Sequence, residues 1–339
     1  MKTSTTIHTV AAPAQAMCGV ADYTAMLVQG FGEVGFKANL CRVDTWDWEG
    51  LQTLRQNVPD TAETVVHVQY PSIGMGKSPW IALVPWMFCK ARVVVTLHEF
   101  AKFGFIRKLY MVPLVVGAKA VVVTNTAEHA CLTRWFPWAK HKCHLIPIGS
   151  NTLPPKEIQR NPNDKGLVYF GQIAPGKGLE GFLDTVEVMK AANPSTPCTL
   201  AGAVVDAQSL LTRRVKEMGK KGLLRLELNK PLSEVSKLLL QHTVAVLPFP
   251  DGITDKRGSA MACLNHGVVV VSTHAAETPL WLAQTTLAYE NPAQAARLVQ
   301  AVMKGTQNQP NPNVLKEGLE ARTWGSIARR HAEIYGDMK

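Results

Sequence analysis

The chain has 339 residues, 46% of them apolar and 18% charged, which suits a folded protein of two domains of about 150–170 residues each. Its net charge of +10 comes without any RNP, helix-turn-helix or finger pattern, so nucleic acid is not an expected partner. No run of about 18 uncharged apolar residues and no signal-peptide segment occurs, and the seven cysteines lack paired spacing, so we expect a cytoplasmic protein with reduced thiols and no transmembrane helix.

The first half of the chain alternates between predicted strands and helices. Ala21–Phe31 places apolar residues on one face of a helix, and other helical patterns or turn signals separate the strands. Strands that alternate with helices indicate a parallel sheet. The runs rich in β-branched residues that predict the strands are Thr5–Val10, Thr64–Gln69, Arg92–Leu97, Lys119–Thr124 and Cys143–Ile148.

A break then divides the chain. Ser150–Lys165 has three prolines, three asparagines and no periodicity, which predicts a linker. Beyond it the alternation resumes, and the last segment, Val314–Tyr335, is predicted to be helical. The sequence therefore predicts an α/β protein with two doubly wound Rossmann-like domains, 1–150 and 165–321, joined by a linker at 151–164 and facing each other across a cleft. The strands of the second domain are predicted at Gly166–Phe170, Pro197–Ala201, Leu223–Leu228, Thr243–Phe249 and Val268–Ser272.

The most informative stretch is Leu167–Glu180, which reads LVYFGQIAPGKGLE. Its apolar run stops at Gly171 and Gln172, and a loop with glycines on both sides of Lys177 leads into a helical pattern. Such a loop exposes backbone N–H groups at a helix start and adds a cation, so it predicts phosphate binding. It matches neither the P-loop nor the G-x-G-x-x-G pattern, and an ordinary strand-to-helix turn is the alternative.

A second stretch of this kind, Leu247–Ser259, follows another buried strand. Its loop carries Asp251 and Arg257, and Gly258 and Ser259 open a predicted helix. Helix-start amides, a hydroxyl and a forked guanidinium all suit phosphate. Two such helix starts in one domain predict a single diphosphate held between them.

Strand ends in the first half supply candidates for sugar and acceptor binding. Gly19 directly precedes the helix that contains Asp22 and Tyr23, and a glycine there lets a ligand approach the backbone. His98 ends the strand in VVVTLHEF, where a histidine can bond a substrate hydroxyl or move a proton. A purely structural role is the alternative for each. The other candidates, with the same alternative, are Gln69, Glu99, Asn125 and, as a ribose contact, Glu290.

Rival chemistries find little support. Cys131, His141, Cys143 and His144 suggest a zinc site, but their spacing matches no usual one, and neighbouring residues of a strand point to opposite faces. No H-E-x-x-H, G-x-S-x-G or D-x-D sequence occurs. We therefore expect no metal and no cofactor, and charge neutralisation by lysine, arginine and helix starts.

The segment from Lys77 to Lys142 is strongly basic. It holds ten Lys/Arg residues against only Glu99 and Glu128, together with ten aromatic residues. Basic residues mixed with amphipathic aromatics suit an anionic membrane surface, so we expect contact with the inner face of the membrane. A solvated basic face over buried aromatics is the alternative.

The ordered segments CGVADYT, HVQYP, VVTLHEF, IPIGSN, FGQIAPGKGLE and VLPFPDGITDKRGSAMACLNHGVVVVST together resemble the GT-B glycosyltransferases of family 4. The resemblance runs from about Gly19 to Trp324. It implies a nucleotide-sugar in the C-terminal domain, an acceptor in the N-terminal domain, and metal-independent transfer that retains the anomeric configuration. WGSIARRHAEIY resembles the last helix of that family, so a helix at about 322–339 is expected to cross back onto the first domain.

The resemblance also implies roles by position. Gly19 would approach the donor, His98 would contact the transferred sugar, and Lys177 would bind the diphosphate together with amides at Gly258 and Ser259. The leaving phosphate itself would accept the proton of the acceptor. The predicted site residues are catalytic His98, Lys177 and Asp251; donor-binding Gly19, Gly171, Gln172, Lys177, Arg257, Gly258, Ser259 and Glu290; and acceptor-side Asp22, Tyr23, Gln69, Glu99 and Asn125.

The chain departs from the family pattern at two places. Gln172 stands where an arginine is common, and Thr254 and Ala262 stand where two glutamates are common. Asp251 or Asp255 is the candidate replacement for the first carboxylate, and Arg257 for the missing cation. We expect a hexosyltransferase-like enzyme of polysaccharide or glycolipid assembly. The alternatives are a non-catalytic homologue that acts as a nucleotide-binding or partner subunit, and a nucleotide-sugar epimerase.

Overall fold

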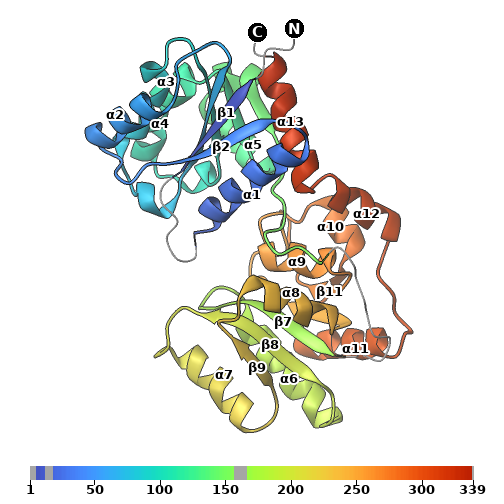
Figure 1. Cartoon of the computed structure of the whole chain (residues 1–339). Helices are drawn as coiled ribbons and strands as arrows, with labels where there is room; N and C mark the ends of the chain where they lie inside the picture. The colour runs from blue at the N-terminus through green and yellow to red at the C-terminus, as the bar shows by residue number, and fades with distance from the viewer. Residues whose placement is uncertain (1–4, 12–17, 156–165, 338–339) are drawn as a thin grey trace. The chain divides into compact units, whose positions relative to one another are not determined.

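The computed structural model describes residues 5–11, 18–155 and 166–337. The chain divides into two compact units, unit 1 with Met1–Gly149 and Ala321–Lys339, and unit 2 with Ser150–Glu320 (Figure 1). Within the described ranges, each unit is built on one six-stranded parallel sheet with helices on its faces. The predicted fold class, two doubly wound α/β domains, is confirmed. Most of the predicted linker, from 156 onward, lies outside the described residues.

The sheet of unit 1 has the strand order β2-β1-β3-β4-β5-β6. The runs rich in valine form its centre because a parallel strand is covered on both faces and must be apolar throughout. The analysis of the sequence missed β2, an edge strand whose residues alternate between partly exposed and exposed. The strands are β1 (Thr6–Ala11), β2 (Lys37–Arg42), β3 (Thr64–Tyr70), β4 (Arg92–Leu97), β5 (Ala120–Val123) and β6 (Cys143–Leu145).

Two sets of helices cover the faces of this sheet. Successive strand residues point to opposite sides, so Val65 packs towards α1 and α13, whereas Val66 packs towards α2, α4 and α5. Figure 1 shows α13 beside α1, and Gly30 permits the close contact, since a methyl group there would lie 2.6 Å from the carbonyl oxygen of Trp324. The helices are α1 (Gly19–Glu33), α2 (Trp48–Asn57), α3 (Val84–Met87), α4 (Phe105–Gly117), α5 (Thr126–Trp135) and α13 (Trp324–Asp337), with short 3-10 turns η1 (Ile73–Met75), η2 (Pro79–Leu83), η3 (Phe100–Lys102) and η4 (Pro137–Lys142).

The sheet of unit 2 has the order β12-β11-β10-β7-β8-β9. Its first strand, β7, is therefore central, and its fourth, β10, lies directly beside it, which is the Rossmann order. The strands are β7 (Leu167–Ile173), β8 (Cys198–Val204), β9 (Arg225–Leu228), β10 (Val244–Leu247), β11 (Val269–Ser272) and β12 (Leu287–Ala288). The helices are α6 (Leu179–Ala192), α7 (Leu210–Lys220), α8 (Leu232–Leu240), α9 (Gly258–Asn265), α10 (Leu280–Thr285), α11 (Pro292–Met303) and α12 (Pro312–Glu320).

The segment that was predicted to be helical, Val314–Tyr335, is divided between two helices. It holds most of α12, a turn, and then α13, and the two helices belong to different units. Thr323 provides the physical reason, because its hydroxyl accepts a hydrogen bond from the amide of Ser326 at 3.2 Å and so starts a new helix. In the ranges that the structure describes, no helix is both long and apolar enough to cross a membrane.

Candidate functional site

The first glycine loop of unit 2 connects β7 to α6. Gly176 and Gly178 have φ angles of +74° and +80°, a region that strains any residue with a side chain. Gly178 is the N-cap of α6, and no side chain caps the first amides of that helix. Lys177 is exposed and makes no hydrogen bond or ion pair with any described residue. The helix-start amides and the lysine ammonium group are therefore available to an anion.

This loop stands where the strand order of unit 2 reverses, between β7 and β10. In doubly wound sheets, the loops after two such strands diverge and leave room for a ligand. Here they also touch, because a methyl group on Gly178 would lie 1.4 Å from the carbonyl oxygen of Pro248, and one on Gly181 would lie 3.2 Å from the Cβ of Pro248. The contact brings together the loops that lead into α6 and α9.

The loop before α9 presents Arg257. Its guanidinium carbon lies 4.8 Å from the centre of the Phe249 ring, and its Nη2 lies 3.7 Å from the Asp251 carboxylate. Its Nε is buried and has no hydrogen-bond partner among the described residues. Gly258, the first residue of α9, has open space where a side chain would be. Arg257 is thus a half-buried cation that has an unused hydrogen-bond donor, Nε, in the described part of the chain. It lies next to the start of α9, where the N-cap side chain makes no capping hydrogen bond.

The other predicted residues of unit 2 vary in their surroundings. Asp251 has a side chain that is 91% exposed, whereas Asp255 is buried and accepts a hydrogen bond from the Trp281 indole at 3.0 Å. Gln172 is exposed near the end of β7, one residue after the partly buried Gly171. Ser259 is partly buried in the first turn of α9, and Glu290 is exposed two residues after the edge strand β12.

Unit 1 contains a buried polar chain that starts at His98. The Nε2 of His98 donates to the side-chain oxygen of Gln69 at 3.0 Å, and the amide nitrogen of Gln69 donates to His67 Nε2 at 3.0 Å. His67 also contacts the Thr96 hydroxyl and, through Nδ1, the hydroxyl of Tyr335 on α13, both at 2.7 Å. His98, at the end of β4, is therefore connected through two side chains of β3 to the C-terminal helix.

The contact with Gln69 places a proton on one ring nitrogen of His98. Because the amide oxygen of Gln69 can only accept, His98 Nε2 is the donor in this hydrogen bond. Burial, with the nearby His331 and His98, holds the pKa of His67 well below its usual value. Burial, with Arg330, His98 and His144, lowers the pKa of His331 to about 3. His67 and His331 are therefore neutral at physiological pH.

Replacing Gln69 tests the buried polar chain. We expect Gln69→Met, which keeps the length of the side chain, to destabilise unit 1 by about 2 kcal/mol, because it removes a donor and an acceptor from two buried imidazoles. Urea denaturation measures the loss. Gln52→Met, the same change on an exposed face of α2, is the control, and equal losses in both variants would contradict the role of the Gln69 amide.

Several of the remaining predicted residues of unit 1 make packing, capping or ion-pair contacts within the fold. The ring of Tyr23 packs edge-on against His98 with centres 4.8 Å apart, and its hydroxyl lies 3.3 Å from His331 Nε2. Asn125 caps α5, since its side chain accepts from the amide of Glu128 at 2.8 Å. Glu99 pairs with Lys102 at 2.8 Å. Gly19 and Asp22 are exposed in the first turn of α1, and the side chain of the N-cap residue, Cys18, makes no capping hydrogen bond there.

Comparison with known proteins identifies the fold. No protein-family model and no curated protein matches the chain, but solved structures do. A glycosyltransferase from Rickettsia africae aligns over 98% of both chains with a TM-score of 0.67 at 14% identity. HepE of Anabaena, in complex with UDP and glucose, aligns over 96% of this chain and 98% of its own, with a TM-score of 0.67 at 11% identity. The pneumococcal O-GlcNAc transferase GtfA, in complex with UDP and GlcNAc, has a TM-score of 0.60 at 13% identity over 85% of this chain, which spans 60% of the length of GtfA.

The chain has the GT-B fold. Within this GT-B chain, the described residues contain no group of three or more His, Cys, Asp or Glu side chains that is arranged to hold a metal ion. The cluster around Cys143 that suggested zinc is thus not assembled, and burial raises the pKa of the Cys143 thiol to about 11.

Sequence analysis of this GT-B chain missed two buried side chains. Tyr289 directly follows β12, and its hydroxyl, which has no partner among the described residues, lies 3.8 Å from where a methyl group on Gly181 would be. His331 stands seven residues after Trp324 and four before Tyr335, a helical spacing that was visible in the sequence. No sequence signal marked Tyr289 as a neighbour of the first turn of α6.

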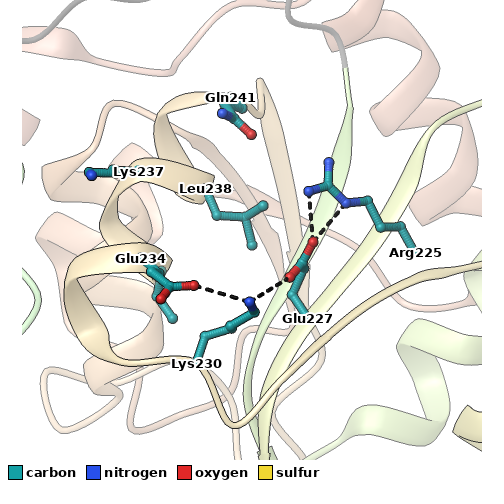
Figure 2. A pocket seen from close by; sticks show the side chains of 8 residues that line it. Arg225, Glu227, Lys230, Glu234, Lys237, Leu238 and Gln241 are labelled. Carbon is teal, nitrogen blue, oxygen red and sulfur yellow. Dashed lines mark hydrogen bonds and ion pairs between the residues drawn. The ribbon is translucent and has the colours of Figure 1, made fainter.

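A groove outside the predicted site lies along β9 and α8 of the GT-B chain. Figure 2 shows four of its charged side chains paired with one another: Arg225 contacts Glu227 at 2.7 Å, and Lys230 lies between Glu227 at 3.8 Å and Glu234 at 3.1 Å. β9 is the edge strand, and β8 separates it from β7. The groove therefore belongs to the sheet edge and not to the loops after β7 and β10.

Proposed function

We propose that the chain is a retaining, metal-independent glycosyltransferase of the family 4 type, which moves a hexose from a nucleotide-diphosphate sugar to an acceptor hydroxyl. The observation that carries the proposal is the contact between the loops that lead into α6 and α9 at the switch point of unit 2. Two structural neighbours support it: GtfA, which is named as an O-GlcNAc transferase, and HepE, and both structures contain UDP and a sugar. The proposed setting is polysaccharide or glycolipid assembly at the inner face of the membrane.

The diphosphate is assigned to these two helix starts. Lys177 supplies an exposed cation, Arg257 supplies a forked one, and Gly258 and Ser259 supply helix-start amides. Because Arg257 is half-buried and stacked on Phe249, its charge is less screened by water than that of a surface arginine. In this proposal it replaces the cation that is missing at Gln172.

In the proposed reaction, the acceptor hydroxyl approaches the sugar from the face that carries the phosphate. The bond from the anomeric carbon to the phosphate oxygen breaks, and a bond to the acceptor oxygen forms on the same face. The acceptor proton passes to the departing phosphate oxygen, so no protein base is required. Cations and amides fixed around the diphosphate favour its departure, because they stabilise charge that develops in the transition state. His98 is assigned to a hydroxyl of the transferred sugar.

Lys177→Ala is the direct test of this site. We expect it to lower the rate of nucleoside diphosphate release about 100- to 1,000-fold, which is typical for removing one group that stabilises developing charge. The fold should survive because Lys177 is exposed and unbonded. The assay uses the full chain with a panel of nucleotide-sugars and sugar acceptors. Lys216→Ala, at an exposed position of α7, is the matched control, and near-parental activity of Lys177→Ala would reject the assigned role.

A second function, a nucleotide-binding homologue without activity, is favoured by one observation. Ala262 lies fully buried in the core of unit 2, so α9 offers no carboxylate at the place where the family carries one. Binding and turnover separate the two functions. Calorimetry that detects UDP or ADP, together with no release from any nucleotide-sugar, would support the non-catalytic homologue.

A further inference from the structure

The helix α4 presents an apolar face outward. Phe105, Ile106, Leu109 and Tyr110 are each between 49% and 66% exposed. With Pro113 and Val116 they form one contiguous arc of the helix, which we call the α4 face, and no charged side chain interrupts it. The opposite side of α4 is buried through Met111, Leu114 and Val115. An outward arc of this size on a folded protein marks a contact surface.

Tryptophans surround the α4 face. Trp86 donates its indole N–H to the carbonyl of Pro113 at 3.1 Å, and the ring of Trp135 lies 5.7 Å from that of Phe105. Figure 1 shows α3, which carries Trp86, next to α4. Trp138 is exposed and lies under Lys142, whose ammonium donates to the carbonyl of Val116. Tryptophan side chains with one polar edge are suited to the zone between water and lipid.

The segment 77–142, which contains α4, is rich in cations and holds only two acidic residues. Glu99 pairs with Lys102, and Glu128 is buried and accepts a hydrogen bond from the amide of Ala101. The two basic residues of α4 turn away from its outer face. Arg107 stacks on Phe103 at 4.2 Å, and Lys108 is buried above Trp135. Three exposed cations lie close in sequence to residues of this surface, and we call them the rim: Arg134 precedes Trp135, Lys119 follows α4 by two residues, and Lys140 lies two residues from Trp138 and from Lys142.

We infer that the α4 face docks on an anionic bilayer, with the apolar side chains inserted and the surrounding lysines and arginine on lipid phosphates. An apolar centre inside a cationic rim combines the two contributions that hold interfacial helices on membranes. A second copy of the chain fits poorly, because two such faces would place cations against cations. The inference deepens the proposed function, which it would bring to a membrane-borne acceptor, and its biological meaning rests on that function.

Vesicle binding tests the apolar part. The full chain is sedimented with vesicles of phosphatidylcholine alone and of equimolar phosphatidylcholine and phosphatidylglycerol. We expect binding to the anionic vesicles only, and Ile106→Ser with Leu109→Ser should weaken it about tenfold or more. Leu210→Ser with Leu280→Ser removes two side chains of unit 2 that are 81% and 72% exposed, and this control should bind like the parent.

Salt and charge variants test the rim. Binding should weaken as salt rises, and Lys119→Gln with Lys140→Gln should reduce it about tenfold. Lys220→Gln with Lys221→Gln changes the net charge equally in unit 2 and should have little effect.

Binding that does not depend on lipid charge, or equal losses of binding in the test and control pairs, would overturn the inference. So would a dimer in solution that Ile106→Ser with Leu109→Ser dissociates, or binding of single-stranded RNA without any binding of vesicles. Vesicle sedimentation does not depend on enzymatic activity. A protein that binds vesicles but shows no activity would therefore contradict the proposed function and still support the docking of the α4 face.

Discussion

Alanine in place of Gly178 is expected to destabilise unit 2 by roughly 4 kcal/mol and to abolish nucleotide binding. Part of the loss is the strain of a side chain at a φ of +80°. The larger part is steric, because the methyl group would lie 1.4 Å from the carbonyl oxygen of Pro248, and backbone must move to admit it. Separating these loops also separates the two proposed halves of the diphosphate site. Urea denaturation and calorimetry with UDP and ADP measure both effects.

The chain supplies a matched control two residues earlier. Gly176 has a φ of +74° but open space around it, so Gly176→Ala carries only the conformational strain, about 1 kcal/mol. Gly258→Ala, also in open space, should leave stability unchanged and weaken only nucleotide binding. Equal denaturation midpoints for Gly176→Ala and Gly178→Ala would show that the loops after β7 and β10 do not touch.

Most of the fold could be predicted from the sequence because buried parallel strands appear in it as continuous apolar runs. Arg92–Leu97 was predicted with the bounds that the structure has, and β10 and β11 lie inside their predicted runs. The edge strand β2 was not predicted because half of its residues face water and it lacks a continuous apolar run.

The site was less predictable because spacing along the chain does not show which distant elements meet. The two helix starts of unit 2 were predicted, but the closeness of Gly178 to Pro248 follows from the pairing of β7 with β10. Tyr23 and Gln69 were predicted on the acceptor side. Tyr23 contacts His331, which lies 308 positions away, and Gln69 contacts His67, whose partner Tyr335 lies 268 positions away. These buried histidines have a measurable consequence for the pH dependence of stability.

Unit 1 is expected to lose stability steeply as the pH falls below about 6.5, the ordinary histidine pKa. The pKa values of His67 and His331 are lowered by burial in the folded state, so below pH 6.5 the unfolded chain takes up protons that the folded chain does not. Stability is therefore fully present above the unfolded pKa and falls with pH, for His331 until its folded pKa of about 3. Between pH 7 and pH 5 the loss is about 2 kcal/mol for His331, and His67 adds a loss of the same sign.

His331→Leu isolates the contribution of His331 to this loss of stability at low pH. Between pH 7 and pH 5 the variant should lose about 2 kcal/mol less stability than the parent, since the contribution of His331 is gone. Comparing the change with pH within each variant removes the cost of the substitution itself, including the contact with the Tyr23 hydroxyl. His141→Leu, at an exposed position of η4, should retain the full loss. Urea denaturation at both pH values decides it: an unchanged acid loss in His331→Leu would mean that His331 is protonated in the folded protein and that its burial beside His67 and Tyr335 is not maintained.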